Sequence, residues 1–437
     1  MVQSARVLVI DEKVSDERSR FWNDLDRFGF HATTCAPDEA LRIGSRERPD
    51  VIVVDARDGA AADEVIASRL AGGDGALPPA ILFLADEGDD TATRTKGLGH
   101  VLYPPLEPGR LAHSLATLLR QNALQQEIDR RVRAAERVGA TPIAPPPATG
   151  AAGTASVLVV GVGRTFLKIE SSLSSFAEVF GALTLDQAED CLASASFDAV
   201  VIEPSIDFDH ALVFAAQLRR NPRLATLPVV MLLDPHFMMG LREAYAAGVT
   251  DVLPTSFAAD DFAVRMAVHA GEVQAHRDLH AAVRALRAPA GDNPAPRLED
   301  ADYLAAYLDI AAGQAAAAVG SLHLATITIA DIAAIEAAHG PAVVAAAREQ
   351  VVRILDRLVR AENLIVALDR ARFAVTFVGS TLEAVETALS RMAAVIRLTP
   401  AVFGEDAQVI VDVETGVASL CAGETGRELL RRALTQA

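Results

Sequence analysis

The chain contains 437 residues, of which 51% are hydrophobic and 22% charged, and its formal net charge is −18. This length is enough for about three domains, and the hydrophobic content is typical of globular domains with packed cores rather than of disordered chains. Because nucleic acids and anionic membrane surfaces attract positively charged proteins, the negative charge argues against either as a direct partner.

Three further features bear on where the protein acts. The sequence has no run of about 18 apolar residues, so we expect no insertion into a membrane. Its first apolar run, at residues 5–10, starts too early to leave room for a signal peptide. Cys35, Cys191 and Cys421 are odd in number and widely spaced, which argues against a disulfide framework or a zinc site. We therefore expect a cytoplasmic protein.

Two stretches rich in proline, alanine and glycine divide the chain. Residues 140–155 and 288–297 are predicted to be linkers, because neither composition favours a helix or a central strand. They separate three predicted domains, at 1–139, 156–287 and 298–437.

The first two predicted domains are repeats of each other. The segment PDVIVVDARDG at 49–59 corresponds to FDAVVIEPSID at 197–207, and three other pairs of segments follow at similar offsets. Short continuous apolar runs alternate with amphipathic stretches, a pattern that predicts a parallel sheet covered by helices on both faces. We predict two flavodoxin-like α/β domains, each a doubly wound sheet of five parallel strands. The long helix predicted at 110–138 exceeds what one domain needs, so we expect it to pack against a partner.

The third predicted domain has a different pattern, α+β with an antiparallel sheet. Its clearest element is a hairpin with strands at 364–368 and 373–377 and a tip at 369–372. Tight hairpins usually carry Gly, Asn or Asp where the backbone needs positive φ. This tip has only Asp369 of that kind and two arginines beside it.

Three carboxylates are predicted to converge in the first domain. Asp11 and Glu12 end its first strand and Asp55 ends its third, which suits Mg²⁺ because carboxyl ends of parallel strands meet at one edge. The pattern resembles the receiver domain of bacterial response regulators, which implies Asp55 as a phosphoacceptor candidate. The hydroxyl and lysine that this family uses are replaced by Leu84 and Pro104, and their loss weakens phosphoryl transfer. Two alternatives stay open: carboxylates that are never phosphorylated, and a weakly phosphorylated or Mg²⁺-binding receiver.

The second domain has lost more of the receiver pattern. The positions of the acid pair, the acceptor, the hydroxyl and the lysine hold, in that order, Gly161 and Val162, Glu203, Leu233 and Thr255. We interpret this domain as a degenerate receiver that serves as a structural adaptor.

Two receiver-like domains followed by this α+β domain resemble the PleD type of response regulator, whose last domain is a GGDEF diguanylate cyclase. In that family, glycines at the hairpin tip let the backbone approach GTP, and the acid after them holds Mg²⁺. Ala371 stands at the position of this acid. The family's other metal, phosphate and guanine ligands are replaced by Thr328, Ala333, Glu336, Ala345, Asp309 and Ile310. Since two-metal phosphoryl transfer needs its metal ligands, the resemblance implies a degenerate domain that is not an enzyme.

A second site of the same family survives in part. The resemblance implies a regulatory site for cyclic di-GMP, made of an Arg-x-x-Asp segment before the hairpin and an arginine on the next helix. Arg360 and Asn363 occupy the segment, with Asn replacing Asp, and Arg391 occupies the helix position. Arginine forks bind guanine or phosphate in a bidentate manner, and Arg357 adds another fork one turn earlier. The alternative interpretation of Arg353, Arg357 and Arg360 is a solvated basic face of a helix.

Together these patterns favour a non-catalytic, cyclic di-GMP-responsive signalling adaptor, and the resemblance implies that it forms a homodimer. The resemblance further implies protein partners, a polar scaffold and a proteolytic adaptor. It places the protein in the cytoplasm at a cell pole, in regulated ClpXP-type proteolysis during the cell cycle. Two alternative functions stay open: a residual diguanylate cyclase, and a two-component scaffold that has no ligand.

Overall fold

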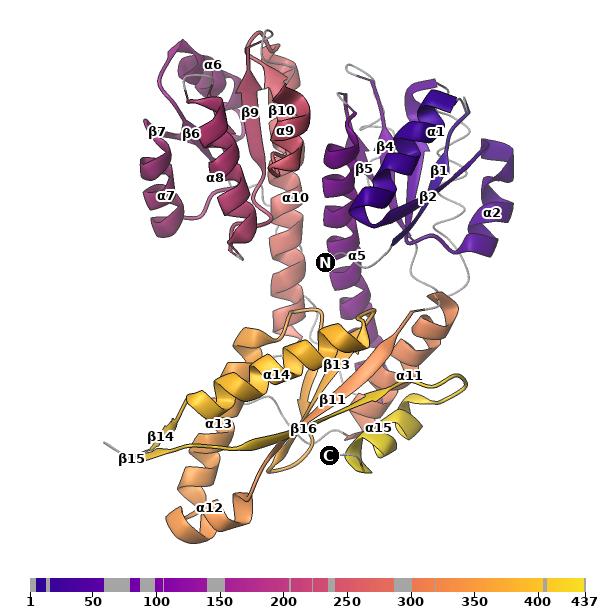
Figure 1. The fold of residues 1–437 in the computed structure, drawn as a ribbon, viewed down its shortest axis with the longest axis vertical. Coiled ribbons are helices and arrows are strands. Elements are labelled where there is room, and N and C mark those ends of the chain that lie inside the picture. The colour runs from indigo at the N-terminus through magenta and orange to yellow at the C-terminus, as the bar shows by residue number, and fades with distance from the viewer. Residues whose placement is uncertain are drawn as a thin grey trace. The chain divides into compact units, whose positions relative to one another are not determined.

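The computed structural model describes residues 5–12, 16–58, 79–86, 99–104, 106–139, 154–203, 206–221, 223–234, 240–286, 301–318, 320–403 and 407–435 (Figure 1). The linkers predicted at 140–155 and 288–297 lie outside these residues, apart from 154 and 155. Within the described ranges, no helix combines the length and the apolar character that crossing a membrane requires.

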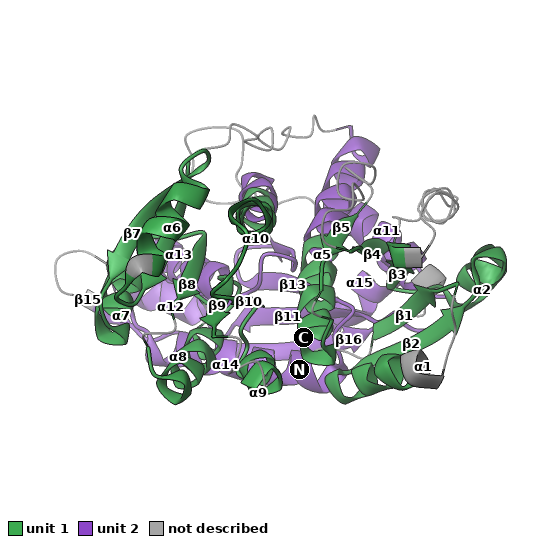
Figure 2. Cartoon of the chain, turned by 90° about the horizontal axis from the view of Figure 1, so that it is seen from above, with its two compact units in different colours: residues 1–122, 148–278 green, residues 123–147, 279–437 purple. Residues whose placement is uncertain are grey.

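Each of the two compact units of the chain is assembled from two separate stretches of sequence. Unit 1 comprises residues 1–122 and 148–278, and unit 2 comprises residues 123–147 and 279–437 (Figure 2). The sheets of both repeats therefore belong to unit 1. The second half of the long helix predicted at 110–138 belongs to unit 2.

The first repeat contains a sheet of five parallel strands in the order β2-β1-β3-β4-β5. The strands are β1 (Ala5–Ile10), β2 (Phe30–Cys35), β3 (Val51–Asp55), β4 (Ala80–Leu84) and β5 (His100–Leu102). The described helices are α1 (Asp16–Asn23), α2 (Ala40–Glu47) and α5 (Pro108–Arg137), with 3-10 turns η1 (Asp24–Phe28), η2 (Pro37–Glu39) and η3 (Ala56–Asp58). Alternate residues of β1 enter two separate cores, Val7 and Val9 on one face and Leu8 and Ile10 on the other. The sheet is thus covered on both faces, as its continuous apolar strands predict.

The second repeat has the same strand order, read from the other edge as β10-β9-β8-β6-β7. Its strands are β6 (Ala155–Val160), β7 (Ala177–Ala182), β8 (Ala199–Ile202), β9 (Val229–Leu233) and β10 (Asp251–Pro254). Its helices are α6 (Arg164–Leu173), α7 (Leu185–Ser194), α8 (Phe208–Arg220), α9 (Leu241–Ala246) and α10 (Ala259–Ala285). The prediction of two parallel five-stranded sheets is confirmed.

Unit 2 is built on a four-stranded antiparallel sheet in the order β12-β13-β11-β16. The strands are β11 (Leu322–Ile329), β12 (Ile365–Ala367), β13 (Arg372–Val378) and β16 (Val413–Ser419), with a separate pair β14 (Ala401–Phe403) and β15 (Ala407–Val409). The helices are α11 (Ala301–Ala318), α12 (Ile332–His339), α13 (Pro341–Leu358), α14 (Leu382–Leu398) and α15 (Gly426–Thr435). Strands β12 and β13 form the predicted hairpin.

The helices of unit 2 lie on both faces of this sheet. α13 and α14 share one core, to which α13 contributes Ala347, Val351 and Leu355 at helical spacing. α11 and α15 share the core on the other face. Because the apolar stripes of α13 and α14 face the same sheet, their charged residues are left on the outer surface.

Candidate functional site

The receiver-like pocket of the first repeat holds two buried aspartates. Asp11 follows β1 and Asp55 ends β3, and they are 1% and 3% exposed, whereas Glu12 is exposed. The Asp55 carboxylate accepts hydrogen bonds from Arg57, at 2.8 Å from Nε to Oδ1 and 2.6 Å from Nη2 to Oδ2. An arginine of the chain itself therefore neutralises the phosphoacceptor candidate. The sequence shows Arg57 two positions after Asp55, but nothing in this spacing predicts that the two side chains meet.

This geometry does not fit the magnesium site that the three carboxylates predict. Among the described residues, no set of three His, Cys, Asp or Glu side chains is placed to hold a metal ion. A cation at Asp55 would have to displace the Arg57 fork, which occupies both carboxylate oxygens. Magnesium binding by Asp11, Glu12 and Asp55 stays a prediction.

We expect Arg57→Ala to increase the phosphorylation of Asp55 by acetyl phosphate and Mg²⁺, because the substitution exposes both carboxylate oxygens. Phosphate-affinity electrophoresis measures the modified fraction, and Asp55→Asn gives the background. Arg42→Ala is the matched control, since Arg42 is an exposed arginine of the same repeat paired with Glu39. Equal modification of the wild type and the Arg57→Ala variant would show that Arg57 does not block the carboxylate.

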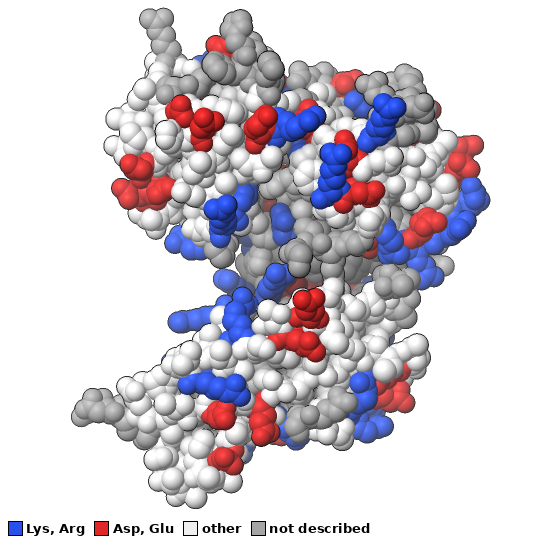
Figure 3. All heavy atoms as spheres, viewed as in Figure 1, with Lys and Arg blue, Asp and Glu red and all other residues white. Residues whose placement is uncertain are grey.

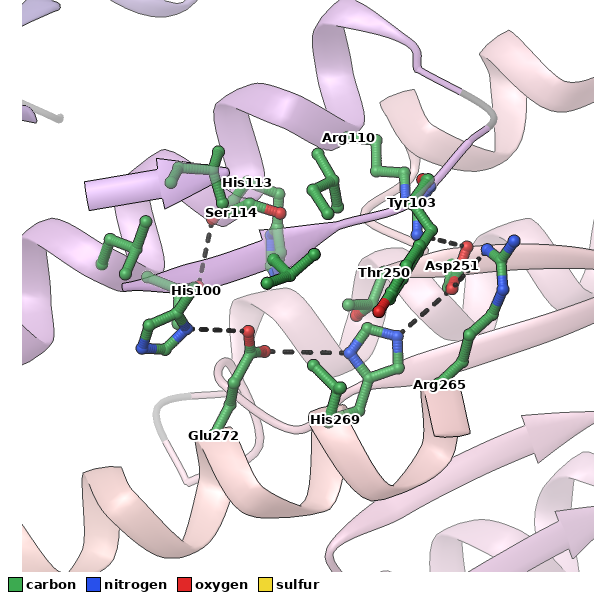
Figure 4. Close-up of a pocket in the computed structure, with 16 residues that line it drawn as sticks. His100, Tyr103, Arg110, His113, Ser114, Thr250, Asp251, Arg265, His269 and Glu272 are labelled. Carbon is green, nitrogen blue, oxygen red and sulfur yellow. Dashed lines mark hydrogen bonds and ion pairs between the residues drawn. The ribbon is translucent and has the colours of Figure 1, made fainter. Parts of the chain in front are cut away.

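Unit 1 also contains a cluster of charged side chains between its two repeats, which we call the seam cluster (Figure 4). It comprises His100 and Arg110 from the first repeat and Asp251, Arg265, His269 and Glu272 from the second. The first residue of the fifth strand contributes to the cluster in both repeats, His100 in β5 and Asp251 in β10. This equivalence is visible in the sequence, but the contacts are not.

Asp251 is the centre of the seam cluster and is fully buried. Its Oδ1 lies 2.9 Å from Nη2 of Arg110, and its Oδ2 lies 3.3 Å from both Nη1 of Arg265 and Nε2 of His269. Burial alone would raise the pKa of Asp251, but Arg110 and His269 hold it well below its usual range. One carboxylate therefore joins cationic groups from both repeats.

Glu272 forms the second acidic position of the seam cluster. Its carboxylate lies 3.1 Å from Nδ1 of His100 and 3.8 Å from Nδ1 of His269. Burial alone would lower the pKa of His269, but its hydrogen bond to Asp251 and the nearby Glu272 carboxylate raise it to about 9. The two acids thus keep His269 protonated at neutral pH, and the cluster forms an ion network that connects the repeats.

The hairpin tip in unit 2 is closed by its own side chains. Oδ1 of Asp369 accepts hydrogen bonds from the backbone N–H groups of Ala371 and Arg372, at 2.8 and 2.9 Å. Oδ2 of Asp369 accepts one from Nε of Arg372 at 2.6 Å. Among the described non-glycine residues, positive φ occurs only at Arg48 and Asp331. The tip therefore needs no glycine, because Asp369 satisfies its backbone without a left-handed residue.

Arg370, the other arginine of the tip, contacts α12. Its Nη2 donates a hydrogen bond to Oε1 of Glu336 at 2.8 Å. By the resemblance to GGDEF domains, Arg370 occupies the position of a tip glycine and Glu336 the position of an asparagine that contacts guanine. The pair is exposed and contributes at most about 1 kcal/mol. It nevertheless links the hairpin tip to α12.

The arginines predicted to bind cyclic di-GMP lie on the surface of unit 2. Arg357 and Arg360 lie at the end of α13 and directly after it, and Arg391 lies on α14, which packs against α13. All three are exposed, and the side chain of Arg360 is 81% accessible. Figure 3 shows basic side chains of unit 2 gathered over the end of α13 and the neighbouring α14.

Asn363 does not share this exposure. The residue is 6% exposed, and its backbone N–H closes a turn by donating to the carbonyl of Arg360 at 3.1 Å. The structure thus brings Arg360 and Asn363 into one turn but points them to different environments. The arginine is therefore more accessible to a surface ligand than Asn363 is, and a direct contact from Asn363 to cyclic di-GMP stays a prediction.

No family model matches the chain, and no curated protein matches it. Solved structures of GGDEF domains do match. The chain is similar to the GGDEF domain of DgcB from Caulobacter crescentus in complex with c-di-GMP, at 18% identity and a TM-score of 0.28 over 29% of this chain and 76% of that chain. It is also similar to the FimX GGDEF domain from Pseudomonas aeruginosa, at 22% identity and a TM-score of 0.28 over 30% and 80% of the two chains. A third similarity is to the active GGEEF domain of a diguanylate cyclase from Vibrio cholerae, at 14% identity and a TM-score of 0.29 over 32% and 88%.

Proposed function

We propose that this protein is a non-catalytic signalling adaptor that binds cyclic di-GMP on the arginine surface formed by Arg357, Arg360 and Arg391. The ligand carries two phosphates and two guanine edges, and arginine forks are suited to both. The residue pattern resembles the regulatory site of GGDEF domains, and the chain as a whole resembles a PopA-like, degenerate relative of the PleD type.

The observation that carries the proposal is the contrast between two groups of arginines in unit 2. Arg370 and Arg372, at the former catalytic tip, are paired with Glu336 and Asp369. In the part of the chain that the structure describes, no carboxylate pairs with Arg357 or Arg391, which are exposed on neighbouring helices. Arg360 has a looser pair, with 3.8 Å between its Nη1 and Oε1 of Glu362. In a chain with a net charge of −18, exposed arginines that are not held in close ion pairs favour an anionic ligand.

Asn363 supports this site through the backbone in our proposal. Its N–H closes the turn that begins at Arg360, and the arginines on the surface contact the ligand. The loss of the family's acid therefore removes a polar contact to guanine but leaves the turn intact. We expect weaker binding than an Arg-x-x-Asp segment would give.

By the same resemblance, we propose receiver-type domains for both repeats, with protein partners that place the adaptor at a cell pole and link it to ClpXP-type proteolysis. In unit 1, the first repeat contacts the second through the seam cluster, by His100 of β5 with Glu272 and by Arg110 of α5 with Asp251. A homodimer formed by this protein would therefore have to use another surface of the first repeat.

Isothermal titration of the full-length protein with cyclic di-GMP is expected to show saturable binding. Because each arginine supplies charge-assisted hydrogen bonds worth about 1.5–3 kcal/mol, Arg360→Ala and Arg391→Ala should each raise the Kd by roughly 10- to 100-fold. The matched control is Arg353→Ala, which removes an exposed arginine of α13 that pairs with Glu349. This control should bind like the wild type.

Three outcomes would contradict the proposal. The wild type could show no heat of binding at high micromolar ligand, which would favour a scaffold without ligand. The Arg360→Ala and Arg391→Ala variants could bind as tightly as Arg353→Ala, which would place the ligand elsewhere. Finally, incubation with GTP and Mg²⁺ could yield cyclic di-GMP, which would revive the alternative of a diguanylate cyclase.

A further inference from the structure

Arg131 is the largest fully buried side chain among the described residues. It lies on the part of α5 that belongs to unit 2, and it is 1% exposed. A charged group that leaves water needs partners for its charge and for its N–H donors. The partners of Arg131 come from three separate segments of unit 2.

The first partner is Glu127, one turn earlier on α5. Its Oε1 accepts a hydrogen bond from Nε of Arg131 at 2.6 Å. Its Oε2 accepts two from Arg130 and one from the hydroxyl of Tyr307. Glu127 is 0% exposed, so the carboxylate fixes the Arg131 guanidinium from the helix side.

The other partners are backbone carbonyl groups. Nη1 of Arg131 donates to the carbonyl of Val283 on α10 at 3.0 Å. Nη2 donates to the carbonyls of Ala361 and Asn363, at 3.2 and 3.3 Å. One planar group thus connects α5, α10 and the turn at 360–363, whose first residue carries the exposed Arg360 side chain.

Apolar packing supports the same junction. Leu124 and Ile128 of α5 and Val283 of α10 form a small buried core, and Ala361 of the turn packs against it. The inner side of the turn is therefore held by both helices, while its outer side presents Arg360 to solvent.

We propose that Arg131 is a positioning residue that sets the conformation of the 360–363 turn and couples ligand binding there to the helices α5 and α10. The coupling rests on the proposed binding of cyclic di-GMP, whereas the positioning of the turn does not. Coupling between two sites is reciprocal, so a ligand that orders the outer side of the turn also stabilises the helix contacts on its inner side. Lysine cannot replace Arg131, because one ammonium group cannot span Glu127 and carbonyls from two other segments.

Hydrogen–deuterium exchange of the full-length protein without ligand tests the positioning. In Arg131→Lys, peptides that cover 279–286 and 359–364 should exchange faster than in the wild type. The matched control is Arg133→Lys, on the same helix, because Arg133 is exposed and paired with Asp129. In this control, the same peptides should exchange at the wild-type rate. Equal exchange in all three proteins would overturn the positioning role, whatever the protein binds.

Exchange with cyclic di-GMP tests the coupling. In the wild type, the ligand should protect the turn and also residues 123–137 and 279–286. In Arg131→Lys, the ligand should protect only the turn, and its Kd should rise by about 10-fold, within the usual range of coupling between sites. Protection confined to the turn in the wild type would overturn the coupling. This measurement uses the wild type alone, so it tests the coupling even if Arg131→Lys does not fold. An absence of any binding by the wild type would refute the coupling and the proposed function together, while the ligand-free comparison would still decide the positioning.

Discussion

Replacing Glu127 by glutamine is expected to destabilise unit 2 by about 3–5 kcal/mol, the usual effect of removing one partner from a buried ion pair. The Glu127 carboxylate is the acid shared by Arg130 and Arg131, which are 3% and 1% exposed. Glutamine keeps the shape but has no charge and only one acceptor oxygen, so two guanidinium groups would remain in the interior without a counterion. Tyr307 would also lose the carboxylate that accepts a hydrogen bond from its hydroxyl, at 2.6 Å between the two oxygens.

Urea denaturation, with hydrogen exchange read on peptides of unit 2, measures this loss. Glu136→Gln is the matched control, because Glu136 is exposed on the same helix and the same charge is removed there. We expect this control to change the free energy of unfolding by less than about 0.5 kcal/mol. A loss below about 1 kcal/mol in Glu127→Gln would mean that water reaches the guanidinium groups, which would contradict the burial described for them.

The stability of unit 1 is expected to be greatest near pH 6.5 and to fall on both sides. The pKa of His269 is raised to about 9, so the folded state holds a proton that the unfolded state releases above about 6.5. The stabilisation from this proton is complete below pH 6.5 and is lost as the pH rises towards 9. A shift of this size corresponds to roughly 3 kcal/mol.

Below pH 6.5, two other groups of unit 1, His113 and Glu272, make the folded state less stable as the pH falls. Burial, together with Arg219 and Arg120, lowers the pKa of His113 to about 3, so only the unfolded state gains this proton as the pH falls below 6.5. Burial would raise the pKa of Glu272, but the hydrogen bond to His100 and the nearby charge of His269 lower it to about 2. Its stabilisation is present above about pH 4.5 and is lost as the pH falls towards 2.

Denaturation curves measured between pH 5.5 and 9.5 check the alkaline side of this profile. His269→Gln should be less stable at pH 6.5 and should lose the decline between pH 6.5 and 9. His31→Gln, at an exposed histidine of unit 1 paired with Asp26, should keep the wild-type profile. A wild-type profile that stays flat between pH 6.5 and 9 would show that His269 is not protonated by the seam cluster.

Local patterns predict the fold of this chain well, because they depend on neighbouring residues. The apolar runs within 49–59 and 197–207 become the buried strands β3 and β8, and the segment 364–377 becomes the hairpin β12–β13. The α+β domain with its antiparallel sheet follows from the same kind of pattern. The arginine surface is also predicted as exposed, because the apolar spacing of α13 fixes which side of the helix faces the core.

The contacts that decide the chemistry are not visible in the sequence. The seam cluster joins residues that are separated by up to about 170 positions, such as His100 and Glu272, and only the packing of the two repeats brings them together. The long helix predicted to meet a partner meets another part of the same chain, because its buried arginine contacts the carbonyls of Ala361 and Asn363. The burial of Asn363 is not visible in the sequence for the same reason, since its carbonyl contacts a helix more than 200 positions earlier.

The division of the chain into discontinuous units has a consequence for biosynthesis. Residues 123–147 leave the ribosome long before residues 279–437, with which they form unit 2. Translation proceeds at about 5–20 residues per second. The segments that cover this part of α5 are therefore synthesised tens of seconds after it, and they bury Leu124, Glu127, Ile128 and Arg131 only then. A nascent or truncated chain that stops before residue 279 therefore exposes an apolar and highly charged helix surface, which is where we expect chaperones or proteases to engage it first.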